Sequence, residues 1–286
     1  MDDPESNSAT AQPLSRRGNH SETALVAPGQ LAASPSPSAK RNAQKLRNPP
    51  ARDVAIAATE YQRFADVLRE LDADDWHKPT DCPDWDVRAV AGHTLGMTRD
   101  FSSLSGVMRR TRAASKAAKA SGGPVIDHMT AMQVADTAAL TTEQLIAQMH
   151  IAGPRAAQWR TKAHPAFRLM PVKETLGGVP ETWRMGYLLD VILTRDPWMH
   201  RVDITRATGQ PMVLTPEHDG RIVADVVAEW ARRHGQPFRL ELTGSAGGSF
   251  THGDHGEDIA LDAVEFCRII SGRAAGTGLL NQEVPF

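Results

Sequence analysis

A carboxylate and an imidazole four residues apart are the strongest chemical signal in this sequence. In the segment LTRDPWMHRVD, Asp196 and His200 lie on either side of Pro197. Two side chains at this spacing can bind one metal ion if they belong to one continuous helix. Alternatively, a helix begins here, with Asp196 as its N-cap and Pro197 as its first residue. The spacing alone is compatible with both interpretations.

An apolar stripe leads into this pair and favours the continuous helix. If the stripe is helical, Asp196 and His200 point toward the protein interior. An unpaired carboxylate would be costly there, so it requires a cation, a hydrogen-bond network or protonation. The stripe consists of Met185, Leu189, Ile192, Asp196, His200 and Asp203, at successive steps of four, three, four, four and three residues.

A third candidate ligand lies much earlier in the chain. In RAVAGHTLG, His93 lies beside an apolar stripe that passes through Val90 and Met97. Asp86 can cap the helix that carries this stripe, so His93 is expected about two turns inside it. A lone helical histidine is more often a surface residue or a hydrogen-bonded core residue. His93 therefore becomes a ligand only if the fold brings it to Asp196 and His200.

The elements that must position these residues are mostly helical. In four segments, apolar residues recur at steps of three and four, which predicts four long amphipathic helices. At least one connection between them is long, so a four-helix bundle is expected. The predicted helices cover approximately residues 54–71, 87–108, 145–159 and 182–208.

A small α+β region is expected after the bundle. A helix over about 216–234 is followed by PFRLELTG, whose alternation of apolar and charged residues predicts a half-buried strand. Glycine-rich GSAGGSF is typical of a hairpin connection. LDAVEFCRIISGR predicts a last helix with Asp262 as its N-cap and Gly272 just beyond its end. The predicted fold class is therefore mainly α, a four-helix bundle followed by a small α+β domain.

The first 50 residues differ in composition from the rest. They contain no Phe, Trp or Tyr, but seven prolines and seven serines. Such a segment buries too little apolar area to offset its ordering entropy, which predicts a disordered tail. A transit peptide is the alternative, against which the acidic Asp2, Asp3 and Glu5 argue. The expected organisation is a tail over 1–50, a bundle over 51–213 and an α+β domain over 214–286.

Charge and hydropathy argue against a nucleic-acid partner and a membrane partner. The net charge is −2, from 32 basic and 34 acidic residues, which gives no reason to expect nucleic-acid binding. No apolar run approaches the roughly 20 residues that span a bilayer, and the start of the chain is unlike a signal peptide. We therefore expect a cytoplasmic protein without a nucleic-acid or membrane partner, as a monomer or homodimer.

The chain contains only two cysteines, Cys82 and Cys267. Two cysteines cannot form a disulfide framework or an all-cysteine zinc site, so histidine and carboxylate must hold any metal. Cys82 precedes Trp85 in an expected loop, and Cys267 lies on the apolar face of the last predicted helix. Neither is expected to be a nucleophile. Trp85 is interpreted as a packing residue.

Two motifs resemble a known family. PTDCPDWDVRAVAGHTLG is similar to the signature of the DinB-like family and its mycothiol-dependent maleylpyruvate isomerase branch, in which a tryptophan opens the second helix and a histidine follows. TRDPWMHRVDITRATGQP is similar to the later motif of actinobacterial members. AVEFCRIISGR is similar to the small C-terminal domain of the same branch. The resemblance covers about residues 52–213 together with this last segment, and it implies a DinB-like bundle.

The resemblance also implies a set of metal ligands. Carried over residue by residue, the ligands of the family fall on His93, Asp196 and His200. The carboxylate is often glutamate in the family, so Asp196 has a shorter reach, and Pro197 would bend the backbone toward the ion. Asp203, one turn beyond His200, would hold its other ring nitrogen, as carboxylates behind metal-bound histidines do.

Two imidazoles and one carboxylate leave a coordination position open, as in a catalytic site for zinc, the expected divalent ion. A thiol that binds there loses its proton. The resemblance implies that this thiol is mycothiol or another small thiol. It implies a thiol S-transferase or isomerase, like maleylpyruvate isomerase, acting on a small electrophile. No GxSxG, P-loop or Rossmann fingerprint is present, and no catalytic residue is predicted beyond the metal site.

Other interpretations of the same residues stay open. The bundle could bind a metal or small ligand without turnover, or be a structural or regulatory protein in which Asp196 only caps a helix. Asp203 could instead form a surface ion pair with Arg201 or Arg206. An anionic substrate would require inward-facing arginines, for which Arg88, Arg195 and Arg201 are positional candidates, with solvated surface charges as the alternative.

Overall fold

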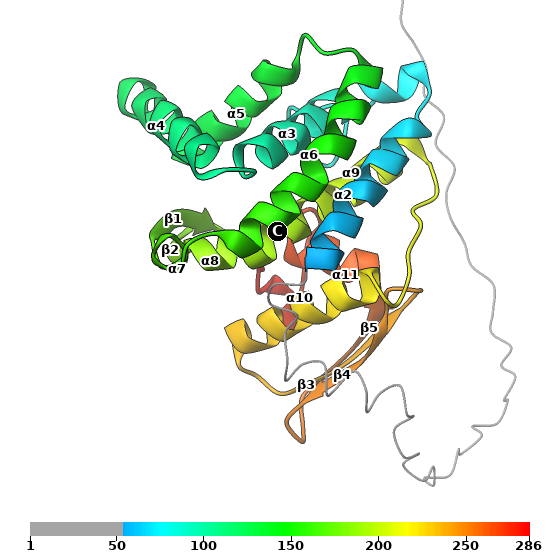
Figure 1. Ribbon diagram of the computed structural model, residues 1–286. Helices are drawn as coiled ribbons and strands as arrows, with labels where there is room; N and C mark the ends of the chain where they lie inside the picture. Colours follow the sequence, from blue (N-terminus) through cyan, green and yellow to red (C-terminus); the bar gives the residue numbers. More distant parts are fainter. Residues whose placement is uncertain (1–53) are drawn as a thin grey trace, which may run out of the picture. The chain divides into compact units, whose positions relative to one another are not determined.

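The computed structural model describes residues 54–286 of the chain (Figure 1). The tail predicted over residues 1–50 lies outside the described residues. All described residues belong to one unit, Pro35–Phe286. They form mostly helices together with two small sheets, which confirms the mainly α class. None of the described helices is both long enough and apolar enough to cross a membrane.

Four long helices form the predicted bundle. α2 and α3 each contact both α6 and α9, so the four helices surround a common core. α2, α3 and α6 contribute residues of the apolar faces that their periodicity predicted, including Phe64 of α2, Val90 of α3 and Met149 of α6. Asp86 caps α3 by accepting a hydrogen bond from the amide of Ala89, as predicted. The bundle consists of α2 (Val54–Arg69), α3 (Val87–Asp100), α6 (Thr142–Lys162) and α9 (Leu193–Thr208).

The second predicted helix is in fact two helices. α3 ends at Asp100, and α4 (Leu104–Ser121) begins after Ser103, whose hydroxyl accepts from the amide of Gly106. α4 packs on α5 (Val125–Thr137), and α5 packs on α3 (Figure 1). The predicted continuous helix over 87–108 is therefore wrong at the break, although the residues on both sides of it enter the same core.

A β-hairpin replaces part of a predicted loop and the start of the fourth predicted helix. β1 (Pro171–Leu176) and β2 (Val179–Arg184) pair antiparallel and are joined by Gly177 and Gly178. Both glycines have positive φ, 53° and 78°, a conformation that a two-residue hairpin turn requires. The fourth helix therefore begins at Met185, directly after the hairpin.

From Met185 onward the helix continues without interruption to α9. Met185–Tyr187 is α-helical (α8), Leu188–Ile192 is π-helical, and α9 follows immediately. Pro197 lies inside α9. The structure confirms the predicted continuity of the helix through Pro197, and the bend expected at this proline stays a prediction. The helix ends at Gly209, which has a φ of 75°.

The C-terminal region is α+β, as predicted. The strand order is β4-β3-β5, with β3 antiparallel to β4 and parallel to β5. β3, the GSAGGSF hairpin and the last helix were predicted, and Asp262 caps that helix. β5 was not predicted. The elements are α10 (Asp219–His234), β3 (Phe238–Thr243), β4 (Gly248–His252), β5 (Glu257–Asp262) and α11 (Ala263–Ile270).

α9 belongs to two hydrophobic cores. Leu193 and Ile204 pack in the core of the bundle, whereas Trp198 and Val202 pack with α10, α11 and the three-stranded sheet. α9 is therefore buried on several sides. The predicted boundary after residue 213 falls between α9 and α10 and stays a prediction. Shorter helices are η1 (Ala73–His77), α7 (Pro165–Arg168) and η3 (Gly278–Asn281).

Candidate metal centre

The three predicted ligands meet between α3 and α9. Oδ1 of Asp196 lies 3.5 Å from Nε2 of His93 and 3.5 Å from Nε2 of His200. One ligand atom from each of the three residues lies within 4.8 Å of the other two. The capped start of α3 places His93 in the bundle interior, and the unbroken α9 places Asp196 and His200 one turn apart.

These separations fit a shared cation better than direct hydrogen bonds. An N–H···O hydrogen bond measures about 2.7–3.2 Å. Two ligands that each lie about 2.1 Å from a tetrahedral zinc ion are about 3.4 Å apart. In addition, Oδ2 of Asp196 and Nδ1 of His93 are buried without a hydrogen-bond partner among the described residues. The donor set and its spacing therefore fit a divalent ion.

Asp196 lies inside the helix and does not cap it. The N-terminal end of α9 is continuous with the π-helical segment, and Asp196 lies in the first turn of α9. The alternative that Asp196 is an N-cap before Pro197 is therefore wrong. Pro197 has no amide hydrogen for the carbonyl of Leu193, one turn earlier. The hydroxyl of Tyr61 donates to this carbonyl at 3.1 Å and replaces the missing hydrogen bond.

Asp203 holds the second ring nitrogen of His200. Its Oδ2 lies 2.9 Å from Nδ1 of His200, and its side chain is fully buried. Arg273 donates to Asp203 from Nε to Oδ1 at 2.7 Å and from Nη2 to Oδ2 at 2.9 Å. The alternative of a surface ion pair with Arg201 or Arg206 is wrong, because those arginines pair with other carboxylates.

Electrostatics favour ionised carboxylates in this cluster. Burial would raise the pKa of Asp196, but His200 and His93 outweigh burial and lower it far below its usual range. Burial likewise opposes the low pKa of Asp203, about 2, which the hydrogen bonds from His200 and Arg273 produce. Burial lowers the pKa of His200, but Asp196 and Asp203 raise it well above its ordinary value.

Two further groups of side chains that could bind a metal lie close together, but arginines already pair with members of each group. Cys82 and Asp203 share their group with His200, and Arg273 contacts both Cys82 and Asp203. Glu60, His218 and Asp219 form the third group. Arg201 pairs with Glu60 and Asp219, and Arg63 pairs with Asp219. The positive charge of these arginines compensates the carboxylates of both groups. Of the three groups among the described residues, only the cluster of His93, Asp196 and His200 has no arginine partner and would be compensated by a metal cation.

A comparison with known protein families identifies the family of this chain. The family model described as "Mycothiol maleylpyruvate isomerase N-terminal domain" matches residues 57–205, just over half of the chain. The chain belongs to this family. The match runs from α2 to α9 and includes His93, Asp196, His200 and Asp203. The family resemblance predicted from the two motifs is thereby confirmed.

Two solved structures are similar to this member of the maleylpyruvate isomerase family. One is a crystal structure of the mycothiol-dependent maleylpyruvate isomerase, with a TM-score of 0.49, and the other is a histidine-to-alanine mutant of that enzyme, with a TM-score of 0.48. Each is 14% identical in sequence, and each alignment covers 80% of this chain and 92% of the other. None of the curated proteins matches the chain.

Sequence reasoning did not place the loop residues Cys82 and Trp85 beside the cluster of His93, Asp196 and His200. The thiol of Cys82 donates to Oδ2 of Asp203 at 3.3 Å. The ring of Trp85 lies 4.9 Å from that of His93 and 6.3 Å from that of His200. The loop before α3 therefore forms one wall of the cluster, and Trp85 packs against its imidazoles. Its position before a capped helix that carries His93 was the available signal for this placement.

Two of the three arginines considered for an anionic substrate, Arg195 and Arg201, are already paired with carboxylates. Arg88 donates to two carbonyls, those of Thr137 and Leu140. Arg195 pairs with two carboxylates, as does Arg201. The alternative, solvated surface charge, is also wrong for Arg195 and Arg201, because both side chains are buried.

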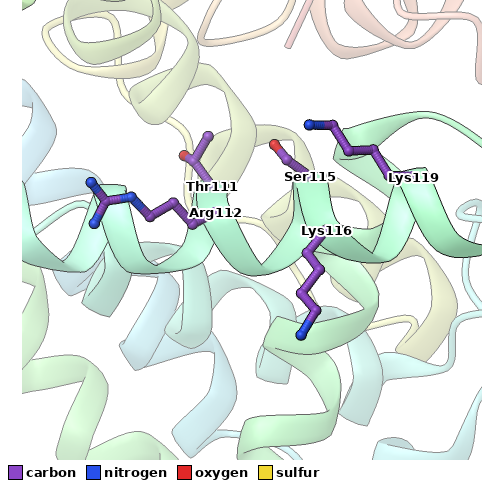
Figure 2. Close-up of a pocket in the computed structure, with 5 residues that line it drawn as sticks. All are labelled: Thr111, Arg112, Ser115, Lys116 and Lys119. Atoms are coloured by element: carbon purple, nitrogen blue, oxygen red, sulfur yellow. The ribbon is translucent and has the colours of Figure 1, made fainter.

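A pocket of about 350 Å³ lies on α4. Figure 2 shows Thr111, Ser115 and Lys119 projecting to one side of the helix, while Arg112 and Lys116 extend in other directions. All five lining residues come from α4, so no second element closes the pocket around a ligand. None of them belongs to the metal cluster.

Proposed function

We propose that the chain is a metal- and mycothiol-dependent S-transferase or isomerase that acts on a small electrophilic substrate. The observation that carries this proposal is the convergence of His93, Asp196 and His200 at metal-ligand spacing, with buried atoms of Asp196 and His93 left unpaired. Membership of the mycothiol maleylpyruvate isomerase family supports the choice of thiol and reaction class.

His93, Asp196 and His200 would hold the divalent ion, for which zinc is the expected choice. When bound, such an ion lowers the pKa of a coordinating thiol, so that the thiolate is available as a nucleophile near neutral pH.

The other residues of the site act on the ligands. Asp203 accepts a hydrogen bond from Nδ1 of His200, which directs Nε2 toward Asp196 and His93. Arg273 holds both oxygens of Asp203 and so fixes its orientation. Trp85 covers the imidazole of His93 with an apolar ring, which limits the access of water to the site. The chain supplies the scaffold, and the nucleophile comes from the cofactor thiol.

Metal content tests the site. Elemental analysis of the purified protein is expected to find about one divalent ion per chain, lost in His93→Ala and in His200→Ala. His255→Ala is the matched control, because His255 is exposed and lies outside the cluster. If the wild-type protein holds no stoichiometric metal and His93→Ala changes neither metal uptake nor stability, the proposed site is wrong.

Consumption of thiol tests the reaction. Metal-loaded protein incubated with mycothiol and a panel of electrophiles that includes maleylpyruvate is expected to consume the thiol faster than the metal-free protein does. If metal binds but the thiol neither coordinates nor is consumed, the enzyme proposal fails. The alternative that the bundle binds a metal or small ligand without turnover would then stand.

A further inference from the structure

Arg160 differs from every other buried arginine that the structure describes. It lies on α6, its residue is 2% exposed, and it forms no ion pair within the described part of the chain. Its Nη2 atom is buried without a hydrogen-bond partner. The other buried arginines, Arg168, Arg195, Arg201 and Arg268, each pair with at least one carboxylate.

The contacts of Arg160 are neutral and leave its charge uncompensated. Nη1 donates to the carbonyl of Leu189 at 3.1 Å and to the hydroxyl of Thr194 at 3.4 Å. The guanidinium lies 5.3 Å from the centre of the Tyr61 ring, which adds a cation–π attraction. A buried guanidinium without an anion is strongly unfavourable, and neutral acceptors offset only part of that cost. Stability alone does not account for an arginine at this position.

Arg160 faces the same stretch of helix that carries the metal ligands. Thr194 lies two residues before Asp196, and Leu189 lies in the π-helical segment just upstream. Tyr61 links the two sites, because its hydroxyl bonds the carbonyl of Leu193. Burial raises the pKa of Tyr61, which the charge of Arg160 lowers and that of Asp196 raises, so both charges lie close to this phenol.

We propose that Arg160 binds a carboxylate of the substrate, whose electrophilic carbon then faces the metal centre. This inference rests on the proposed function and deepens it, because it assigns one residue of this chain to the recognition of the substrate. The free Nη2 donor would form a charge-assisted hydrogen bond to the carboxylate, which guanidinium groups favour. The carboxylate would supply the negative charge that Arg160 lacks.

Binding of maleate, a small dicarboxylate, tests this assignment without any thiol. Calorimetric titration of the full-length, metal-loaded protein is expected to show maleate binding, whereas the neutral diamide of maleate does not bind. Arg160→Met is expected to bind maleate about 30-fold more weakly, which corresponds to about 2 kcal/mol. Arg155→Met is the matched control, because Arg155 is exposed on the same helix. Its affinity for maleate is expected to equal that of the wild type.

Thermal unfolding without ligand separates a binding role from a structural one. Arg160→Met removes an uncompensated buried charge but also the donor to the carbonyl of Leu189, so its melting temperature is expected to stay close to that of the wild type. A lower melting temperature together with unchanged maleate affinity would assign Arg160 a structural role and overturn the proposal. If Arg160→Met does not fold, Arg160→Lys, which keeps the charge but loses the planar donor, is expected to bind maleate more weakly than the wild type.

Two further outcomes keep this proposal separate from the function on which it rests. Failure of the wild-type protein to bind maleate overturns the carboxylate assignment, even if thiol is consumed with neutral electrophiles. Conversely, binding of maleate that depends on Arg160, without any consumption of thiol, supports the anion site while the proposed thiol chemistry fails.

Discussion

The hydrogen bond between Tyr61 and Leu193 gives a quantitative test of how α9 tolerates its internal proline. The Tyr61 hydroxyl lies 3.1 Å from the carbonyl that Pro197 leaves without an amide partner. Tyr61→Phe leaves this buried carbonyl unsatisfied, so it is expected to lower the free energy of unfolding by about 1–3 kcal/mol. Pro197→Ala restores an amide hydrogen to the same carbonyl. In the Pro197→Ala background, Tyr61→Phe is expected to lower the free energy of unfolding by about 1–2 kcal/mol less than it does in the wild type.

Urea unfolding of the wild type, the two single variants and the double variant measures this coupling, provided that the denaturant dependence stays the same. Tyr187→Phe is the matched control, because its hydroxyl donates to Glu229 at 2.7 Å and not to α9. Its effect is expected to be equal with and without Pro197→Ala. Additive effects of Tyr61→Phe and Pro197→Ala would refute the explanation that the phenol compensates the proline.

Three further predictions follow from the described contacts. Asp203→Asn removes the charge that holds His200 and is expected to weaken metal binding about 10- to 100-fold in competition with a chelator, whereas Asp258→Asn, in an exposed pair with Arg239, leaves metal affinity unchanged. In the metal-free protein, the depressed pKa of Asp203, about 2 against an ordinary 3.8, contributes about 2 kcal/mol to the free energy of unfolding above pH 4, and this contribution is lost as the pH falls toward 2. Urea unfolding at several acid pH values should therefore show a shallower loss of stability in Asp203→Asn, and an unchanged slope would contradict the assigned ion pairs. An added Cβ at Gly178 would meet no atom within 4 Å, but the residue has a φ of 78°, so Gly178→Ala is expected to lower the free energy of unfolding in urea by about 1 kcal/mol. Gly220→Ala, inside α10 and without a positive φ, is expected not to lower it.

Apolar periodicity predicted the bundle helices but not where they break. Phe101 and Val107 both pack in the bundle core, on either side of the turn between α3 and α4, whereas Leu104 and Met108 at the end of the predicted helix are exposed. Only the cap formed by Ser103 marks the second start. The hairpin was missed although its signal was present, because two glycines between Leu176 and Val179 are typical of a two-residue turn. β5 was missed because its stability depends on parallel pairing with β3, which local sequence does not encode.

The three proposed metal ligands could be selected from the sequence because their spacing is local or belongs to a motif. Asp196 and His200 are one helical turn apart, and His93 lies at a fixed distance from the cap that starts α3. Arg273 follows α11 and reaches Asp203 only because the C-terminal region packs on α9. Such contacts depend on tertiary packing and leave no periodic signal in the sequence.

The contacts around α9 explain why one helix carries an unusual backbone at the candidate site. Its π-helical entry and its proline both disturb the regular hydrogen-bond pattern, and such features often mark functional segments. Side chains from other helices satisfy the affected carbonyls, with Tyr61 on Leu193 and Arg160 on Leu189. Arg273 likewise fixes Asp203 behind His200 from outside the matched family range. The proposed ligands all lie on α3 and α9, but their orientation depends on α2, α6 and the segment after α11. Substitutions in those elements should therefore change metal affinity without removing any ligand.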